Sequence, residues 1–141
     1  MTRGIRFRCD LTNRTSIQAY ADANWGGDKQ TRRSTSGVLC LLCGGPVVYK
    51  SKRQNTVALS PAEAEYVALA LATQEVLWLR YLPVEMGFKA EATTLQLDNK
   101  SAIAMATNHS YTPRAKHIDL RAHFVRDDIE AGRIKLKHVP T

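Results

Sequence analysis

The chain has 141 residues, of which 44% are hydrophobic and 23% charged, a balance typical of one soluble globular domain with a sizeable core. It has no run of eighteen apolar residues, and the opening "MTRGIRFRCD" lacks the apolar core of a signal peptide, so we expect an intracellular protein with no membrane contact. The 20 basic and 13 acidic residues give a net charge of +7, which favours a polyanion such as nucleic acid as partner.

The cysteines argue against two kinds of stabilising site. Cys9, Cys40 and Cys43 are odd in number, and no Cys or His set has zinc-ligand spacing, so neither a disulfide framework nor a structural zinc is expected. Cys40 and Cys43 lie in the apolar run "VLCLLC", where cysteine behaves as a small hydrophobe. We therefore expect buried core thiols.

The first part of the chain predicts three strands. Residues 1–15 are polar and basic with no clear period, so we expect a flexible lead-in or linker remnant before a domain over residues 16–141. Three segments have the composition of strands, "SIQAYADA", "STSGVLCLLCGG" and "PVVYKSKR". Gly44, Gly45 and Pro46 mark the second turn, and three successive strands favour an antiparallel meander.

The strongest helix signals begin at Ser60. Ser60 is a suitable N-cap, Pro61 suits the first helical position, and Glu63 completes an S-x-x-E capping box. Leu59 and Ala64 are placed to form a hydrophobic staple. The expected apolar face consists of residues at helical spacing: Ala64, Val67, Ala68, Leu71, Trp78 and Leu82.

This helix is expected to end at Gly87. "TTLQLD" then predicts a short strand, and "NKSAIAMATN" a short helix directly after Asp98. A further helix is predicted from about Pro113, with Thr112 as cap and Gly132 as terminator. "RIKLKHV" predicts a closing strand. The apolar face of the last helix consists of Ile118, Ala122, Val125 and Ile129.

Three acids stand at the edges of these elements: Asp22 and Asp98 at the ends of the first and fourth strands, and Glu65 early in the long helix. If the two strands are neighbours and the helix crosses them, the three carboxylates meet. Clustered carboxylates repel unless a cation offsets the repulsion, and oxygen ligands suit Mg²⁺ or Mn²⁺. Two such ions can support phosphodiester cleavage. Other roles stay open, because the helix dipole also favours Glu65 and Asp98 is also a suitable N-cap.

A specific resemblance covers about residues 16 to 141. The chain resembles the ribonuclease H domain of copia-type long-terminal-repeat retrotransposon polyproteins in four blocks of unbroken order: "YADANWGGDKQTRRSTSGVLCLL", "SKRQNTVALSPAEAEYVALALATQEVLWLR", "LDNKSAIAMATN" and "RAKHIDLRAHFVRDDIEAGRIKLKHVPT". It implies the α/β ribonuclease H-like fold, a mixed five-stranded sheet flanked by helices. It also implies metal-dependent endonucleolytic hydrolysis of the RNA strand of RNA–DNA hybrids during reverse transcription. The implied partners are the hybrid and a reverse transcriptase domain of the same polyprotein, in a cytoplasmic particle or the nucleus.

The resemblance also implies residue roles. It matches Asp22 of "ADANW", Glu65 of "AEAEYVAL" and Asp98 of "LDNKSAI" to the catalytic acids of the family, which bind Mg²⁺ or Mn²⁺, and it leaves Glu63 to the capping box. The family has a fourth carboxylate on a final helix that would lie beyond Thr141. We therefore expect a fold that lacks this helix and an activity weakened by the loss of that ligand.

Three further acids precede the last strand, Asp119, Asp127 and Asp128, but they lack the family context of a fourth ligand. We expect them to be solvated partners of Arg121 or Arg126 at helical spacing.

A hybrid presents ribose hydroxyls in a shallow minor groove and phosphates along its strands. His117 and Arg121 lie one turn apart, away from the apolar face of their helix, and are candidates for the hybrid or the site rim, although a surface histidine needs no such role. We expect Trp78 in the core and leave Trp25 open between core and stacking platform. The candidates for the hydroxyls are Asn24, Asn99 and Ser101. The candidates for phosphates are Arg32, Arg33, Lys52 and Arg53, although Arg32 and Arg33 also suit a solvated turn.

Other classes remain open. A basic ribonuclease-H-like module that binds nucleic acid but cuts poorly is one, and a reused interaction protein on the same fold is another. Integrases place their catalytic Glu last, and the related 3′-to-5′ exonucleases begin with Asp-x-Glu. The order here is Asp, Glu, Asp, which fits neither.

Overall fold

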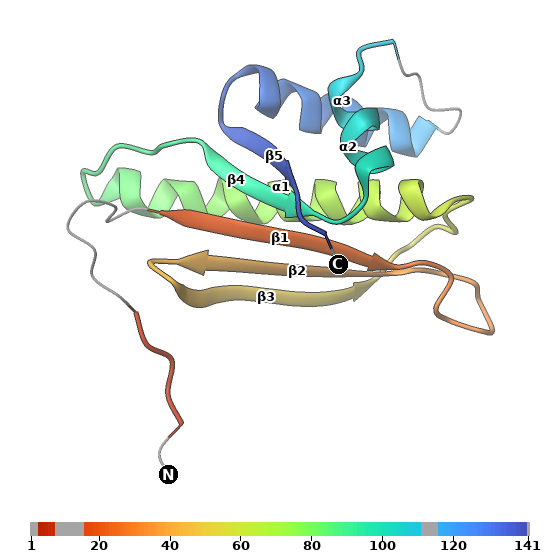
Figure 1. Cartoon of the computed structure of the whole chain (residues 1–141), viewed down its shortest axis with the longest axis horizontal. Helices are drawn as coiled ribbons and strands as arrows, with labels where there is room; N and C mark the ends of the chain where they lie inside the picture. The colour runs from red at the N-terminus through yellow and green to blue at the C-terminus, as the bar shows by residue number, and fades with distance from the viewer. Residues whose placement is uncertain (1–2, 8–15, 111–115, 141) are drawn as a thin grey trace.

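The computed structural model describes residues 3–7, 16–110 and 116–140, which form one mixed sheet with helices packed against it (Figure 1). Its elements occur in the predicted order. They are β1 (Ile17–Asn24), β2 (Thr35–Leu42), β3 (Gly45–Arg53), α1 (Pro61–Glu85), β4 (Thr93–Leu97), α2 (Lys100–Thr107), α3 (Lys116–Glu130) and β5 (Ile134–His138).

Several predicted features lie outside the described residues. These are most of the lead-in with Cys9, and the expected start of α3 at Thr112 and Pro113. Within the described ranges, no helix combines the length and the apolarity that crossing a bilayer requires. Cys40 is fully buried, as expected, and burial raises the pKa of its thiol to about 11, whereas Cys43 is only half-buried.

The strands lie in the order β3-β2-β1-β4-β5. β1, β2 and β3 are antiparallel neighbours, which confirms the predicted meander, whereas β4 is parallel to β1 and β5 is parallel to β4. The two residues between β2 and β3, Cys43 and Gly44, have φ angles of 51° and 76°, as a tight type I′ hairpin turn requires. Because β1 and β4 run in the same direction, their carboxyl ends lie at the same edge of the sheet.

The start of α1 follows from its sequence. The Ser60 side chain accepts a hydrogen bond from the Glu63 amide at 3.2 Å, and a Glu63 carboxylate oxygen accepts one from the Leu59 amide at 2.8 Å. The predicted staple is wrong, because the Leu59 side chain is 82% exposed and does not cover Ala64. Gly87, with a φ of 84°, follows the end of the helix, as predicted.

Small side chains let α1 lie close to the sheet. Ala64, Ala68 and Ala72 are fully buried at four-residue spacing, and α1 packs along the sheet against β1, β2 and β4 (Figure 1). The predicted apolar face fails in its last turns, because Trp78 is 66% exposed and Leu82 is 47% exposed. The periodicity placed Trp78 and Leu82 correctly on one face of α1. In the described structure, no other element covers the last turns of that face.

The apolar face of α3 packs as predicted, but two charged residues expected on its surface are buried. Ile118, Ala122 and Val125 of α3 are buried, and the Tyr66 hydroxyl of α1 donates to the Ala122 carbonyl at 3.5 Å. Asp128, expected to be solvated, is instead buried.

Asp128 is paired with Arg133 across the turn that follows α3. Arg126, one of the two arginines expected to pair with these acids on the surface, is also buried, and it donates to the carbonyls of Met105 and Asn108 at 2.9 and 3.0 Å. Arg126 therefore ties α3 to the end of α2, and Asp128 ties α3 to the residue before β5. Asp119 lies 3.6 Å from His123 in an i,i+4 pair.

The Ser60 cap gives a test of this fold. Replacing Ser60 with Ala leaves the Glu63 amide without its acceptor, so we expect a loss of about 1 kcal/mol in the free energy of unfolding, measured by urea denaturation. The Ser60→Asp variant keeps an acceptor and should stay close to the original stability. Equal stability of Ser60→Ala and the original chain would contradict the capping role.

Candidate metal centre

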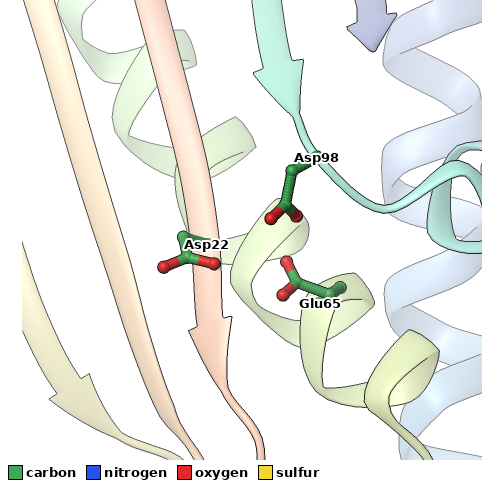
Figure 2. A group of neighbouring side chains, drawn as sticks. All are labelled: Asp22, Glu65 and Asp98. Atoms are coloured by element: carbon green, nitrogen blue, oxygen red, sulfur yellow. The ribbon is translucent and has the colours of Figure 1, made fainter. Parts of the chain in front are cut away.

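Three carboxylates converge at one end of the sheet (Figure 2). Asp22, Glu65 and Asp98 each offer an oxygen atom, and these oxygens lie within 4.8 Å of one another. The Glu65 side chain is buried, whereas Asp22 and Asp98 are exposed. A group of this size, open to solvent on one side, can hold a divalent cation together with water or a phosphate oxygen.

Strand pairing brings the two aspartates together. Tyr20 of β1 is in register with Gln96 of β4, so Asp22 and Asp98, each two residues further on, reach the same level of adjacent parallel strands. They also share the side-chain alternation of their strands. The spacing of two acids far apart in sequence is therefore set by backbone pairing.

Helix packing places the third carboxylate. Glu65 lies in the second turn of α1, next to the buried Ala64. Its Oε1 accepts a hydrogen bond from the Ala23 amide of β1 at 3.1 Å. Its Oε2 is buried and accepts none from the described residues. One oxygen is thus fixed to the sheet, and the other faces the two aspartates without a donor.

This environment disfavours the charged form of Glu65. Burial raises the pKa of Glu65 to about 7, against an ordinary value of 4.5, and the negative charges of Asp22 and Asp98 raise it further, whereas the Ala23 amide lowers it. A bound divalent cation would reverse the two raising effects, since it supplies a partner for the buried oxygen and offsets the repulsion. The donor set therefore fits a hard cation.

The end of β4 is held by a residue that sequence analysis missed. The His138 Nε2 lies 2.9 Å from the backbone carbonyl of Asp98, and the Val139 amide donates to the Leu97 carbonyl at 2.8 Å. His138 is in parallel register with Leu97. Its position depends on strand order, and the only signal in the sequence was its place at the end of a predicted strand.

The predicted hydroxyl contacts lie on the elements that carry the acids. Asn24 ends β1, and its side chain packs against Gly27. The Asn99 side-chain oxygen accepts a hydrogen bond from the Ala102 amide at 3.0 Å, so it is the N-cap of α2. Ser101 is exposed in the first turn of α2.

Trp25 directly follows β1, three residues after Asp22. It is half exposed, and its indole nitrogen donates to the Ala58 carbonyl at 3.1 Å, just before the start of α1. This bond fixes one edge of the ring and leaves the rest accessible to solvent. Trp25 is thus not a core residue.

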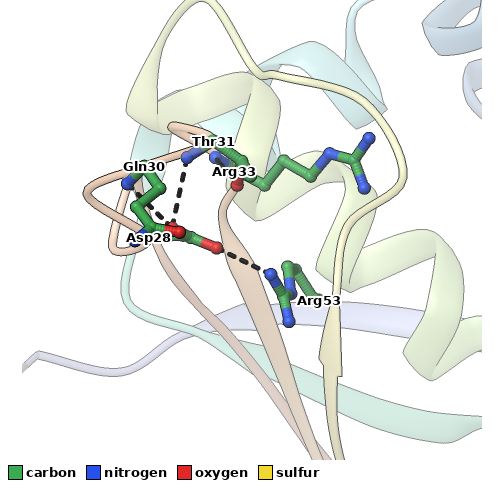
Figure 3. Close-up of polar contacts among 5 residues, drawn as sticks. All are labelled: Asp28, Gln30, Thr31, Arg33 and Arg53. Carbon is green, nitrogen blue, oxygen red and sulfur yellow. Dashed lines mark hydrogen bonds and ion pairs between the residues drawn. The ribbon is translucent and has the colours of Figure 1, made fainter.

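The predicted phosphate contacts separate into two groups. Arg32 and Arg33 are exposed in the turn before β2, where the Asp28 carboxylate accepts hydrogen bonds from the amides of Gln30 and Thr31 (Figure 3). These amides, that of Thr31 above all, hold the pKa of Asp28 below its ordinary value. Arg53 pairs with Asp28 at 2.7 Å, whereas the Arg33 side chain extends away from this pair.

The second group lines one hollow. Lys52, Arg53 and Arg121 border a cavity of about 280 Å³ between the end of β3, α1 and α3. Gln54 also lines it, and its buried amide oxygen has no donor among the described residues. The structure therefore brings three of the predicted basic residues together. His117 lies in α3, but its side chain is outside the described part.

Comparison with known proteins identifies relatives of this chain. It is 35% identical over 125 residues to the Retrovirus-related Pol polyprotein from transposon TNT 1-94 of Nicotiana tabacum, covering 89% of this chain and 9% of that protein. It is 60% identical over 78 residues to Secreted RxLR effector protein 161 of Plasmopara viticola, covering 55% of this chain and 54% of that protein. No family model matches the chain.

Solved structures identify the fold. LC11-RNase H1, isolated from compost, matches with a TM-score of 0.65 and 16% identity over 89% of this chain and 85% of that chain. The structure of LC11-RNase H1 in complex with an RNA/DNA hybrid matches with a TM-score of 0.60 and 15% identity over 89% and 86% of the two chains. The chain has a ribonuclease H-like fold. It is also a homologue of copia-type retrotransposon Pol polyproteins, and it spans 9% of the length of the Nicotiana relative.

The raised pKa of Glu65 makes the stability of this ribonuclease H-like domain depend on pH. Between pH 4.5 and about 7, the folded state keeps a proton on Glu65 that the unfolded state has released, so the free energy of unfolding falls as the pH rises. We expect Glu65 to contribute a fall of the order of 3 kcal/mol without divalent ions. Urea denaturation across this range, compared with Glu65→Gln, isolates the effect. Parallel profiles for the two proteins would contradict it.

Proposed function

We propose that the chain is a ribonuclease H that hydrolyses the RNA strand of RNA–DNA hybrids endonucleolytically, with Mg²⁺ or Mn²⁺ held by Asp22, Glu65 and Asp98. The observation that carries the proposal is the convergence of these carboxylates around a buried Glu65 oxygen that has no described donor. In a Pol polyprotein, a domain of this kind would act beside the reverse transcriptase domain, in a cytoplasmic particle or the nucleus.

The residues present suit such a reaction. When bound, divalent ions would activate water and stabilise the leaving oxygen of a phosphodiester. Asp22 and Asp98 face solvent and can meet a phosphate, while Glu65 is fixed from behind by the Ala23 amide. Asn24, Ser101 and the exposed part of Trp25 are our candidates for contact with the minor groove of the hybrid. The +7 net charge favours binding of the polyanion.

A cleavage assay with paired variants tests the catalytic acids. We expect Mg²⁺ or Mn²⁺ to support cleavage confined to the RNA strand of a labelled hybrid, with duplex DNA and duplex RNA left intact. Asp22→Asn and Glu65→Gln should each lower the rate at least a hundredfold, because each removes a charged ligand. Glu63→Gln is the matched control, since Glu63 lies two residues from Glu65 but bonds the Leu59 amide. A similar loss for Glu63→Gln and Glu65→Gln would contradict the assignment.

Metal binding can be measured apart from activity. At pH 8, adding Mg²⁺ or Mn²⁺ should raise the midpoint of thermal unfolding, because the ion stabilises the folded state alone. The Asp98→Asn variant should lose this rise. A shift of equal size in both proteins would place the ion elsewhere.

The two tryptophans report on hybrid binding separately. In a Trp78→Phe variant, Trp25 is the only tryptophan, and we expect its fluorescence to change when a hybrid is added without divalent ions. In a Trp25→Phe variant, the emission of Trp78 should stay constant, because Trp78 lies in the later turns of α1, far from the three acids. Hybrid binding with no change in Trp25 emission would exclude Trp25 from the contact.

A second candidate is a module that binds nucleic acid or protein without cutting. The observation that favours it is the 60% identity over 78 residues to Secreted RxLR effector protein 161. The same hybrid assay separates the two candidates. Binding without cleavage in Mg²⁺ and Mn²⁺ supports the module, and absence of both binding and cleavage supports an interaction protein.

A further inference from the structure

The last turns of α1 and the residues after them expose an unusual amount of apolar surface. Their large side chains are between 39% and 67% exposed. Single exposed apolar residues are common on soluble proteins, but a group gathered at one end of a helix is a candidate interaction surface. The group, called the α1 patch, consists of Trp78, Tyr81, Leu82, Val84, Met86 and Phe88.

The α1 patch lies between two hollows, one on each side of the helix. Tyr81 and Val84 line a cavity of about 500 Å³ toward α3, with Phe124 on its far wall. Trp78 lines another of about 610 Å³ toward β3, with Tyr49. The patch thus offers projecting rings beside open hollows, and a contact between two identical surfaces needs such a combination of projecting and recessed parts.

The charges beside the patch favour an apolar partner over a polyanion. Lys50 pairs with Glu75 at 2.5 Å at one border. At the other, Arg133 pairs with Asp128, and Arg80 donates to the backbone carbonyl of Glu91. These basic groups already have partners within the chain, so a nucleic acid would gain little from them.

The area fits a modest dimer. At roughly 180 Å² for a whole large apolar side chain, the exposed fractions of all six patch residues amount to at most roughly 600 Å² per chain. Two copies would bury up to about 1,200 Å², which is the lower end of the range for specific interfaces.

We propose that the α1 patch is the interface of a symmetric dimer of this chain. A two-fold axis at Leu82 places Trp78, four residues before it, opposite Met86 of the second copy, four residues after it. A methionine sulfur against an aromatic ring is a favourable contact. Glu65 and Leu82 are about 25 Å apart along the helix, so each carboxylate group stays open in the dimer.

Sedimentation velocity between 2 and 200 µM tests the proposal. We expect the original chain to pass from monomer to dimer over this range, and Leu82→Glu to remain monomeric at 200 µM. Leu120→Glu is the matched control, because Leu120 is the same residue type and is 63% exposed, against 47% for Leu82, but lies on α3 outside the patch. It should dimerise like the original chain. Circular dichroism verifies that each variant is folded, and Trp78→Lys replaces Leu82→Glu if the latter is not.

A second readout locates the contact. In the Trp25→Phe variant, the Trp78 emission should shift to shorter wavelength as the protein concentration rises. A monomer at 200 µM overturns the proposal and leaves the patch to another part of a longer polyprotein. A folded Leu82→Glu dimer also overturns it, because the interface then lies elsewhere. Hybrid cleavage is measured on the same samples, so an original chain that cleaves the hybrid but stays monomeric at 200 µM contradicts this inference alone.

Discussion

The parallel pairing of β1 and β4 is the constraint on which the candidate metal centre depends. This pairing brings Asp22 and Asp98 to the same height along adjacent strands, and the side-chain alternation of the strands places both carboxylates on the same face of the sheet. α1 then adds Glu65 from a third direction, since its buried alanines allow it to lie against β1, within hydrogen-bond reach of the Ala23 amide. The three acids come from different elements, so their convergence depends on the whole fold and not on any short stretch of sequence.

The two ends of α1 differ in the size of their side chains and in how they are covered. Its first turns carry Glu65 and pack on the sheet through small side chains, whereas its last turns carry the large side chains of the α1 patch. The helix is apolar on more than one side, which is typical of a helix with partners on more than one side. β1, β2 and β4 cover one of these sides and α3 another, so the exposed remainder suggests a contact outside the single chain.

Local signals in the sequence predicted much of the fold. The Ser60 cap, Gly87, and Gly44 in the hairpin each depend on a few adjacent residues, and the structure confirms their positions. The convergence of the acids could be proposed from element edges, but choosing among alternative roles required the family resemblance. Two of the predictions that were wrong concerned contacts beyond a single element. Periodicity placed Trp78 on the apolar face of α1 without showing that nothing in the described chain covers it. Asp128 was misjudged because its partner Arg133 lies beyond the helix, outside the i,i+4 pattern.

Asp28 and Glu65 are two carboxylates in opposite environments, and the difference favours a metal-binding role for Glu65 over a purely structural one. The Asp28 carboxylate accepts from two amides and pairs with Arg53, and its pKa is lowered, as expected for an acid whose charge stabilises a turn. Glu65 has one amide, a buried oxygen without a described donor, and two acids facing it, and its pKa is raised. An acid that only stabilised the fold would gain nothing from this position, because its charge is opposed by burial and by its neighbours. A cation between the three carboxylates would give the buried Glu65 oxygen a partner and would offset the repulsion by Asp22 and Asp98. This exchange of repulsion for attraction is the physical basis of the proposed activity.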